Sequence, residues 1–229
     1  TREARREAEE APVTLEAPSF TGSPFDASMG GTVRDVRLTM RDVILMRADK
    51  GIVVSGSGDA IYSQNLSVTV AGVALNFDRG YQWIDARVGH QRLRFVNTHL
   101  EAFSSDLALA QASELLAAAV PAHRDVVFVC DCNSDPLDDS VKPADTVPHK
   151  AAYDLITGAG GFTDEWLRWA PPEAGWTSGL SETVDDATGD GFDHRIDMVF
   201  ARSASGAGFR VDRGAVTGTD VADRDPVTG

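Results

Sequence analysis

The sequence predicts an α/β fold in which two mainly antiparallel sheets pack face to face with helices outside. Three observations indicate this class. Short apolar segments follow one another between Gly, Asp and Asn turn signals. The segment Leu66–Val70 alternates apolar and polar residues, as a half-exposed antiparallel strand does. One or two helical segments interrupt the strands, and such helices usually cover the outer face of a sheet.

The first 31 residues are expected to form a charged segment and a loop, and the domain is expected to span residues 32–229. Thr1–Ala11 is dense in charge and favours helix, either as a solvated helix or as the frayed remnant of one. Pro12–Gly31 is rich in Pro, Gly and Ser, which predicts a loop. Five strands are then expected, at Val36–Thr39, Val43–Arg47, Ile52–Ser57, Leu66–Val73 and Tyr81–Val88.

The second half alternates helices and strands. A helix is expected over Ser105–Val120, because Ser104 or Ser105 can cap it and Asp106 suits the positive end of the helix dipole. The remaining expected elements are a central strand at Val126–Asp131, a short helix at Ala151–Thr157 ending at Gly158, and a late strand at Phe209–Val216.

Composition excludes some functions. The hydrophobic fraction of 42% and the charged fraction of 24% are ordinary for a globular protein. No apolar run approaches the length needed to cross a bilayer. The formal charge of −14 argues against a broad surface for nucleic-acid phosphates, although a bound cation could still support phosphate chemistry locally. A small phosphoester, a lipid head group or adaptation to salt fits this acidity.

The two cysteines are expected to be small hydrophobic residues of the sheet interior. Cys130 and Cys132 lie two positions apart on one strand, which places their Cα atoms about 6.5 Å apart, at the far end of disulfide geometry. Metal ligation or redox switching would need further partners or a different spacing.

Polar residues close three apolar segments. Side chains alternate along a strand, so Val127, Val129, Asp131 and Asn133 are predicted to share one face. By the same alternation Leu93 and Phe95 share a face with Asn97 and His99. A third segment begins with Arg195 and Asp197 and then becomes apolar. Buried polar groups are costly unless they are paired or used, so these residues predict a binding or catalytic site.

Each signal has a simpler explanation when it is taken alone. Asp131 with Asn133 is an ordinary strand terminus, His99 is a hydrogen-bonded core histidine, and Asp197 with Arg195 is a structural ion pair. The functional interpretation depends on the three segments together.

Three motifs in one order carry a resemblance: "NTHL" at 97–100, "DxNSDP" at 131–136 and "RIDMVF" at 195–200. In this order they resemble the endonuclease/exonuclease/phosphatase superfamily. That family usually has Gly-Asp-Phe-Asn where this chain has Cys130-Asp131-Cys132-Asn133. The early strand with the family's metal-binding Glu and the late Ser-Asp-His are not found, so the chain is expected to be a partial domain.

The resemblance implies a four-layer α/β/β/α sandwich, incomplete at both ends, and hydrolysis of a phosphoester by the parent protein. It implies catalytic roles for His99, Asp131, Asn133 and Asp197, substrate contacts from Asn97 and Arg195, and a metal held partly by Asp131 and Asn133. The implied metal is Mg²⁺, with Mn²⁺ or Ca²⁺ as alternatives. The 229 residues alone are expected to be inactive or nearly so. The alternative function is a catalytically dead scaffold or binding module that retains the fold.

Substrate, partners and location are less defined. Nucleic acid, a phospholipid head group and a small phosphate all stay open as substrates, because the predicted loops near the site have no stacking or basic pattern. No stable protein partner is implied, and a monomer is expected. The sequence does not fix the compartment, and an extracellular location is favoured over a cytoplasmic one.

Overall fold

A computed structural model describes residues 11–16, 37–47, 50–70, 73–180 and 191–220 of the chain. The described strands are β1 (Ala11–Glu16), β2 (Arg37–Asp42), β3 (Val53–Ile61), β4 (Leu66–Val70), β5 (Val73–Phe77), β6 (Gly80–Val88), β7 (Gln91–His99), β8 (Asp125–Asp131), β9 (Thr163–Asp164) and β10 (Asp197–Arg202). The described helices are α1 (Ser105–Ala118), α2 (Ala151–Thr157) and α3 (Glu165–Trp169).

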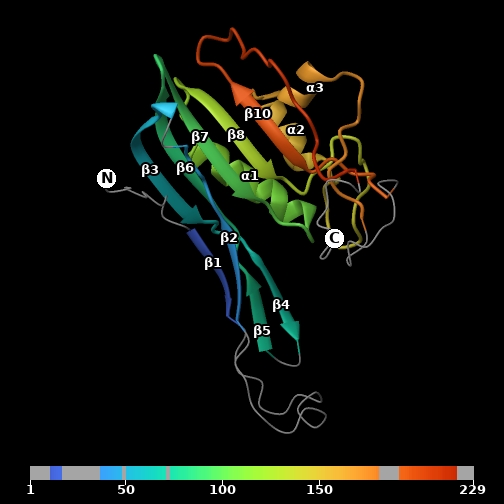
Figure 1. Cartoon of the computed structure of the whole chain (residues 1–229). Coiled ribbons are helices and arrows are strands. Elements are labelled where there is room, and N and C mark those ends of the chain that lie inside the picture. The colour runs from blue at the N-terminus through green and yellow to red at the C-terminus, as the bar shows by residue number, and fades with distance from the viewer. Residues whose placement is uncertain (1–10, 17–36, 48–49, 71–72, 181–190, 221–229) are drawn as a thin grey trace.

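A six-stranded sheet forms the centre of the molecule, with the strand order β3-β6-β7-β8-β10-β9 (Figure 1). Its neighbouring strands are antiparallel except for β7 and β8, which run parallel. A parallel pair needs a crossover connection, and α1 supplies it between β7 and β8. The polar ends of these two strands therefore meet at one edge of the sheet.

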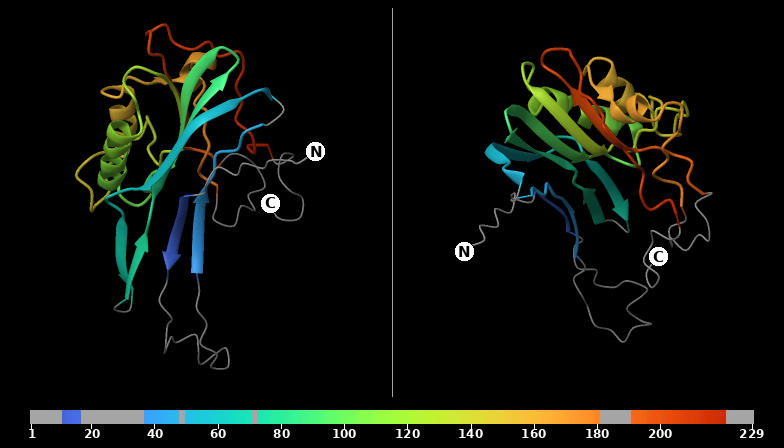
Figure 2. Two further views of the ribbon diagram at one scale, coloured as in Figure 1. Left: turned by 90° about the vertical axis from the view of Figure 1, so that its left-hand side faces the viewer. Right: turned by 45° about the horizontal axis from the view of Figure 1, so that its top comes forward.

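Helices α1 and α2 cover one face of this sheet (Figure 2). The core between them is fully buried and contains Val96, Phe128 and Phe200 from the strands and Leu115 and Ile156 from the helices. Burying such side chains contributes about 1.5–3 kcal/mol each. Ser104 caps α1, as predicted, because its Oγ accepts a hydrogen bond from the backbone N–H of Leu107 at 3.3 Å.

Neither α1 nor α2 covers the opposite face of the sheet, which we call the helix-free face; on that side two side chains of the short helix α3, Trp166 and Trp169, line a cleft. Gln82 pairs with Asn97 in the β6–β7 register, and its side-chain amide donates to the backbone carbonyl of Asp42, the last residue of β2. The two-stranded β1–β2 sheet thus reaches the central sheet from the helix-free side. This layering confirms the predicted α/β class and is consistent with a sandwich.

Four predicted elements differ from the structure. Val43–Arg47 and Phe209–Val216 have strand-like sequences, but no neighbouring strand pairs with them among the described residues. The single strand predicted over Leu66–Val73 is a hairpin, in which β4 and β5 pair with each other. The loop predicted from Pro12 is wrong as far as Glu16, because these residues pair with β2. Residues 1–10 and 17–31 lie outside the described residues.

The interpretation of Cys130 and Cys132 as unbonded hydrophobic residues is also wrong. The structure joins them in a disulfide, with Cα atoms 5.0 Å apart. The predicted spacing assumed a fully extended strand, but β8 ends at Asp131, between the two cysteines, and the chain is less extended there. Within the described chain, no helix combines the length and apolar character needed to span a membrane.

Candidate active site

Three predicted site residues lie side by side on neighbouring strands. His99 is the register partner of Asp131 in the parallel β7–β8 pair, and Asp131 is the partner of Asp197 in the antiparallel β8–β10 pair. Nε2 of His99 lies 3.2 Å from Oδ2 of Asp131. Asn97 lies two residues before His99 on the same face, opposite Val129. The sheet therefore brings these four residues together on its helix-free face.

The surroundings of His99 favour the uncharged form of its imidazole. Its side chain is about two-thirds enclosed, with 31% exposure. Burial lowers the pKa of the His99 imidazole, and the guanidinium of Arg79 lowers it further. Asp42, Asp197 and Glu101 act in the opposite direction without reversing the shift. A neutral imidazole near neutral pH can donate one hydrogen bond and accept another.

His99, Asp131 and Asp197 form a row across the three strands, and the two carboxyl groups of this row have raised pKa values. Burial is the main cause at Asp131, opposed by the backbone N–H of Asn133, which donates to Oδ1 at 3.1 Å. Burial also raises the pKa of Asp197, and the neighbouring charge of Asp131 raises it further. Thr177 opposes this shift from the loop before β10. Both carboxyl groups are therefore stronger proton acceptors than ordinary aspartates.

Asn133 lies beside this row without continuing the strand. Because β8 ends at Asp131 and Asn133 has a positive φ, the alternation used to predict its face does not apply. Its side-chain Nδ2 donates to the carbonyl of Leu100 at 2.9 Å. This bond fixes the amide and directs its Oδ1 away from that contact, so Oδ1 is available as an acceptor or ligand.

Arg195 does not join the row. Its guanidinium is buried on the helix side, where Nη2 lies 2.7 Å from Oδ2 of Asp164 and Nη1 lies 3.0 Å from the sulfur of Met198. The hydroxyl of Tyr153 donates to the same Asp164 oxygen at 3.0 Å. Arg195 also lines the cleft beside the carboxylates, so its predicted substrate contact stays a prediction. The simpler explanation, a structural ion pair, is correct in kind, with Asp164 as the partner in place of Asp197.

Two residues near the row were missed by sequence reasoning. Asp42, at the end of β2, has a pKa raised by burial and lowered in part by His99 and Arg79. Arg79 lies immediately before β6 and is only 7% exposed. Both occupy segments that resemble turns in sequence, and an arginine before a glycine carries no motif signal. Their proximity to His99 depends on pairings between distant segments.

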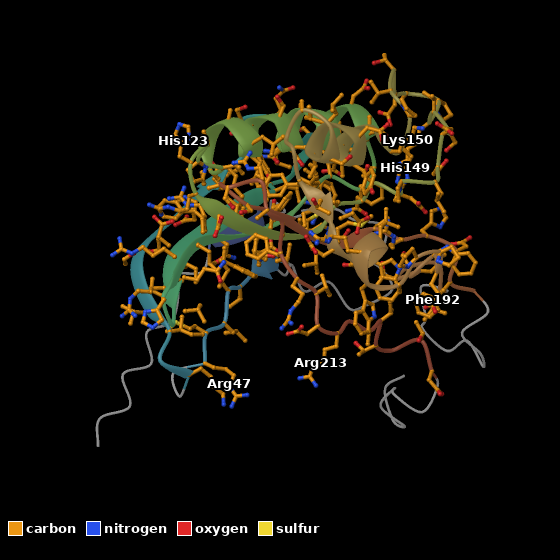
Figure 3. The ribbon with its side chains drawn as sticks, turned by 90° about the horizontal axis from the view of Figure 1, so that it is seen from above. Arg47, His123, His149, Lys150, Phe192 and Arg213 are labelled. Atoms are coloured by element: carbon orange, nitrogen blue, oxygen red, sulfur yellow. A yellow bond between two sulfur atoms is a disulfide. The ribbon has the colours of Figure 1, made fainter. Side chains whose placement is uncertain are left out.

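A cleft of about 630 Å³ extends from the carboxylates along the helix-free face. The C-terminal segment that carries Arg213 crosses this side of the sheet, whereas His149 and Lys150 lie on the helix side (Figure 3). The cleft is lined by side chains that include Asn97, Val129, Asp131, Trp166, Trp169, Asp197, Val199, Arg213 and Val216.

The oxygen atoms of the site suit a hard cation. Asp131, Asp197 and the Oδ1 of Asn133 are all oxygen donors, and the mutual repulsion of the two carboxylates would be relieved by a bound positive charge. Among the side chains that the structure describes, no group of three His, Cys, Asp or Glu residues is arranged to hold a metal by itself. A cation such as Mg²⁺ commonly retains several waters and needs only one or two protein carboxylates.

No family model matches the sequence, and no curated protein is similar to it at a significant level. Among solved structures, the chain is similar to the mannosyl-6-phosphatase of Bacteroides thetaiotaomicron, at 15% identity and a TM-score of 0.42, covering 68% of this chain and 54% of that one. It is similar to D. rerio TDP2 complexed with a single-strand DNA product, at 17% identity and a TM-score of 0.44, covering 69% and 56%.

The human Nocturnin catalytic domain with bound sulfate is similar at 12% identity and a TM-score of 0.40, with coverage of 84% of this chain and 60% of that one. The chain thus spans little more than half the length of these structures. Matches at this level concern the fold. They include two proteins described as endonuclease/exonuclease/phosphatase family members.

Proposed function

We propose that the row of His99, Asp131 and Asp197 belongs to the active site of a metal-dependent phosphoesterase. The observation that carries the proposal is their register: three residues from motifs far apart in sequence occupy matching positions on three adjacent strands. Rigid strands fix the separations of catalytic groups better than loops do. A structural explanation would have to account separately for one imidazole and two adjacent carboxylates on the same exposed face.

Each residue has a role that its geometry supports. Asp131 or Asp197, with a raised pKa, would accept a proton from the attacking water. The one N–H of the neutral His99 imidazole, at Nε2, would donate to Asp131 and orient that carboxylate, which leaves Nδ1 as an acceptor for a water or a substrate hydroxyl. Asn97 would support the substrate from the same face. Asn133 holds the turn that presents Asp131, through its bonds to Asp131 and Leu100.

Asp131 and the Oδ1 of Asn133 would hold the metal, for which Mg²⁺ is proposed, with Asp197 close by. When bound, such an ion would neutralise charge on the phosphoryl oxygens during hydrolysis. Mn²⁺ and Ca²⁺ are the alternatives to be compared.

The proposal is tested with a generic phosphodiester such as bis-p-nitrophenyl phosphate. The assay is run on the 229-residue chain and on a chain extended by its natural flanking sequence, with Mg²⁺, Mn²⁺, Ca²⁺ or EDTA. We expect hydrolysis that EDTA abolishes and that Asp131→Asn and His99→Gln reduce by about 100-fold or more. Asp212→Asn is the matched control, because Asp212 is exposed and, among the described residues, pairs with Arg210 on the surface.

Two outcomes would overturn the proposal. Metal-independent hydrolysis in both chains would reject the metal, and activity unchanged by Asp131→Asn would reject the site. A properly folded chain that lacks activity with every metal and in both lengths would favour the alternative of a scaffold or binding module.

We also propose an oxidising, extracellular location. Disulfides persist in such compartments and are rare in the cytoplasm, and the bond between Cys130 and Cys132 supports this placement. Free thiols at these positions in protein isolated from its natural source would contradict it.

A further inference from the structure

Arg79 has a fixed position beside the row of site residues. Its backbone N–H donates to Oδ1 of Asn65 at 2.8 Å, and its carbonyl accepts from the N–H of Tyr62 at 2.9 Å. The next residue, Gly80, begins β6, and its carbonyl accepts a hydrogen bond from the hydroxyl of Thr98 at 2.6 Å. Arg79 is therefore anchored next to the end of β7, where His99 lies.

The guanidinium of Arg79 lacks the partners that a buried arginine normally has. The residue is 7% exposed, and its Nε is buried without a hydrogen-bond partner. Among the described residues, its guanidinium makes no hydrogen bond and no ion pair within 4.0 Å. Its charge nevertheless acts on His99, Asp131 and Asp42, so it lies within electrostatic reach of the site.

An unpaired buried charge is expensive, and buried charges in proteins are normally paired and hydrogen-bonded. The other buried arginine of the region, Arg195, illustrates the ordinary case, because Asp164 and Met198 occupy its guanidinium. Arg79 has five donors in a planar fork, a geometry that matches a phosphate or another oxyanion. Its lack of partners indicates that an anion completes its environment.

We propose that Arg79 binds the phosphoryl group of the substrate and places it against His99 and Asp131. This inference rests on the proposed function of the site and deepens it, because it assigns the substrate's charge to a particular protein group. It also explains how a chain with a net charge of −14 could hold an anion beside the carboxylates of Asp42, Asp131 and Asp197. The site would then select a compact phosphate group and would not need a broad basic surface.

The test measures the binding of inorganic phosphate to the 229-residue chain by isothermal titration calorimetry, without any divalent metal. Arg79→Gln removes the charge, and Arg79→Lys keeps the charge but loses the fork. Arg92→Gln is the matched control, because Arg92 lies in β7 at the end away from His99 and is exposed. Thermal melting without phosphate accompanies each titration.

We expect Arg79→Gln to weaken phosphate binding by about 10- to 100-fold, and Arg79→Lys to restore part of it. Arg92→Gln should bind as the unmodified chain does. Arg79→Gln removes a buried charge that attracts Asp42 and Asp131 but whose Nε has no hydrogen-bond partner, so these effects oppose each other and its melting temperature should stay within a few degrees of that of the unmodified chain. A purely structural arginine would give a larger fall in the melting temperature.

Three results would overturn the inference: no phosphate binding by the unmodified chain, equal binding by Arg79→Gln, or an equal loss in Arg92→Gln. These results are distinguishable from failure of the proposed function. Phosphate binding lost with Arg79 in a chain that hydrolyses nothing would support the anion site and reject catalysis. Hydrolysis together with phosphate binding that Arg79→Gln leaves unchanged would support catalysis and reject the anion site at Arg79.

Discussion

His99 and Asp131 occupy the same register position of the only parallel strand pair in the described sheet, with Nε2 of His99 3.2 Å from Oδ2 of Asp131. Parallel strands end at the same edge, so two polar strand ends that are 32 residues apart in sequence meet directly. Asp197 joins them because β10 runs antiparallel to β8 and begins where β8 ends. The row is therefore a consequence of topology.

Replacing Asp131 should change the protonation of Asp197. In Asp131→Asn the like charge beside Asp197 is removed, so the pKa of Asp197 should fall toward its ordinary value. Carbon-detected NMR titration of the side-chain carboxyl of Asp197 measures this shift. Asp212→Asn serves as the control and should leave Asp197 unchanged. An unaltered titration in Asp131→Asn would mean that the two carboxyl groups do not interact.

His99 should titrate below its ordinary pKa of 6.5, because burial and Arg79 both disfavour its charged form. A lowered pKa in the folded state means that the unfolded state binds the proton more readily. The stability contributed by neutral His99 is thus fully present above the unfolded pKa and is lost as the pH falls through 6.5 toward the folded value.

NMR of the imidazole gives the pKa of His99 directly, and thermal melting between about pH 8 and about pH 5 gives its effect on stability. The comparison needs His99→Gln, since the raised pKa values of Asp131 and Asp197 act in the opposite sense. Those carboxyl groups cost stability as the pH rises above their unfolded value of 3.8. If the variant loses stability on acidification as steeply as the unmodified chain, His99 is not the source.

The sequence was sufficient for the fold class and for the residues of the row, because alternation along an apolar strand is a local property. Partners that depend on chain reversals were not predictable. Asp42 reaches the site through β2, whose end is fixed by a hydrogen bond from Gln82. The ion-pair partner of Arg195 was not predictable, because Arg195 precedes β10 and pairs with Asp164 from a distant segment. The predicted face of Asn133 was wrong because Asn133 follows the end of β8, where the alternation of side chains along the strand has stopped.

The buried pair of Arg195 and Asp164 should matter for stability. Arg195→Met would leave the charge of Asp164 buried, with Tyr153 as its side-chain hydrogen-bond partner among the described residues, and we expect a loss of about 3–5 kcal/mol in the free energy of unfolding. Urea denaturation measures it. The double variant Arg195→Met/Asp164→Leu should lose less than the sum of the single variants. Unchanged stability together with weaker phosphate binding would support the substrate role predicted for Arg195.

The disulfide between Cys130 and Cys132 should act locally on Asp131, which it encloses. The closed loop is very short, so its entropic contribution to stability is small, roughly 1–2 kcal/mol. Its larger effect is on the turn that directs the N–H of Asn133 to Asp131 and the amide of Asn133 to Leu100. Reduction by a dithiol should therefore shift the NMR signals and the pKa of His99, while the melting temperature falls by only a few degrees.

Cys130→Ala/Cys132→Val separates the bond from the thiols, since it keeps small apolar side chains in the same buried space. This variant should resemble the reduced chain and should not respond to the dithiol. Thiol titration of the denatured, unreduced protein should find no free cysteine. If reduction leaves His99 unaffected, the turn is held by its hydrogen bonds alone, including the bond from the N–H of Cys132 to the carbonyl of Ile196 at 2.8 Å. The covalent link would then be dispensable for placing Asp131.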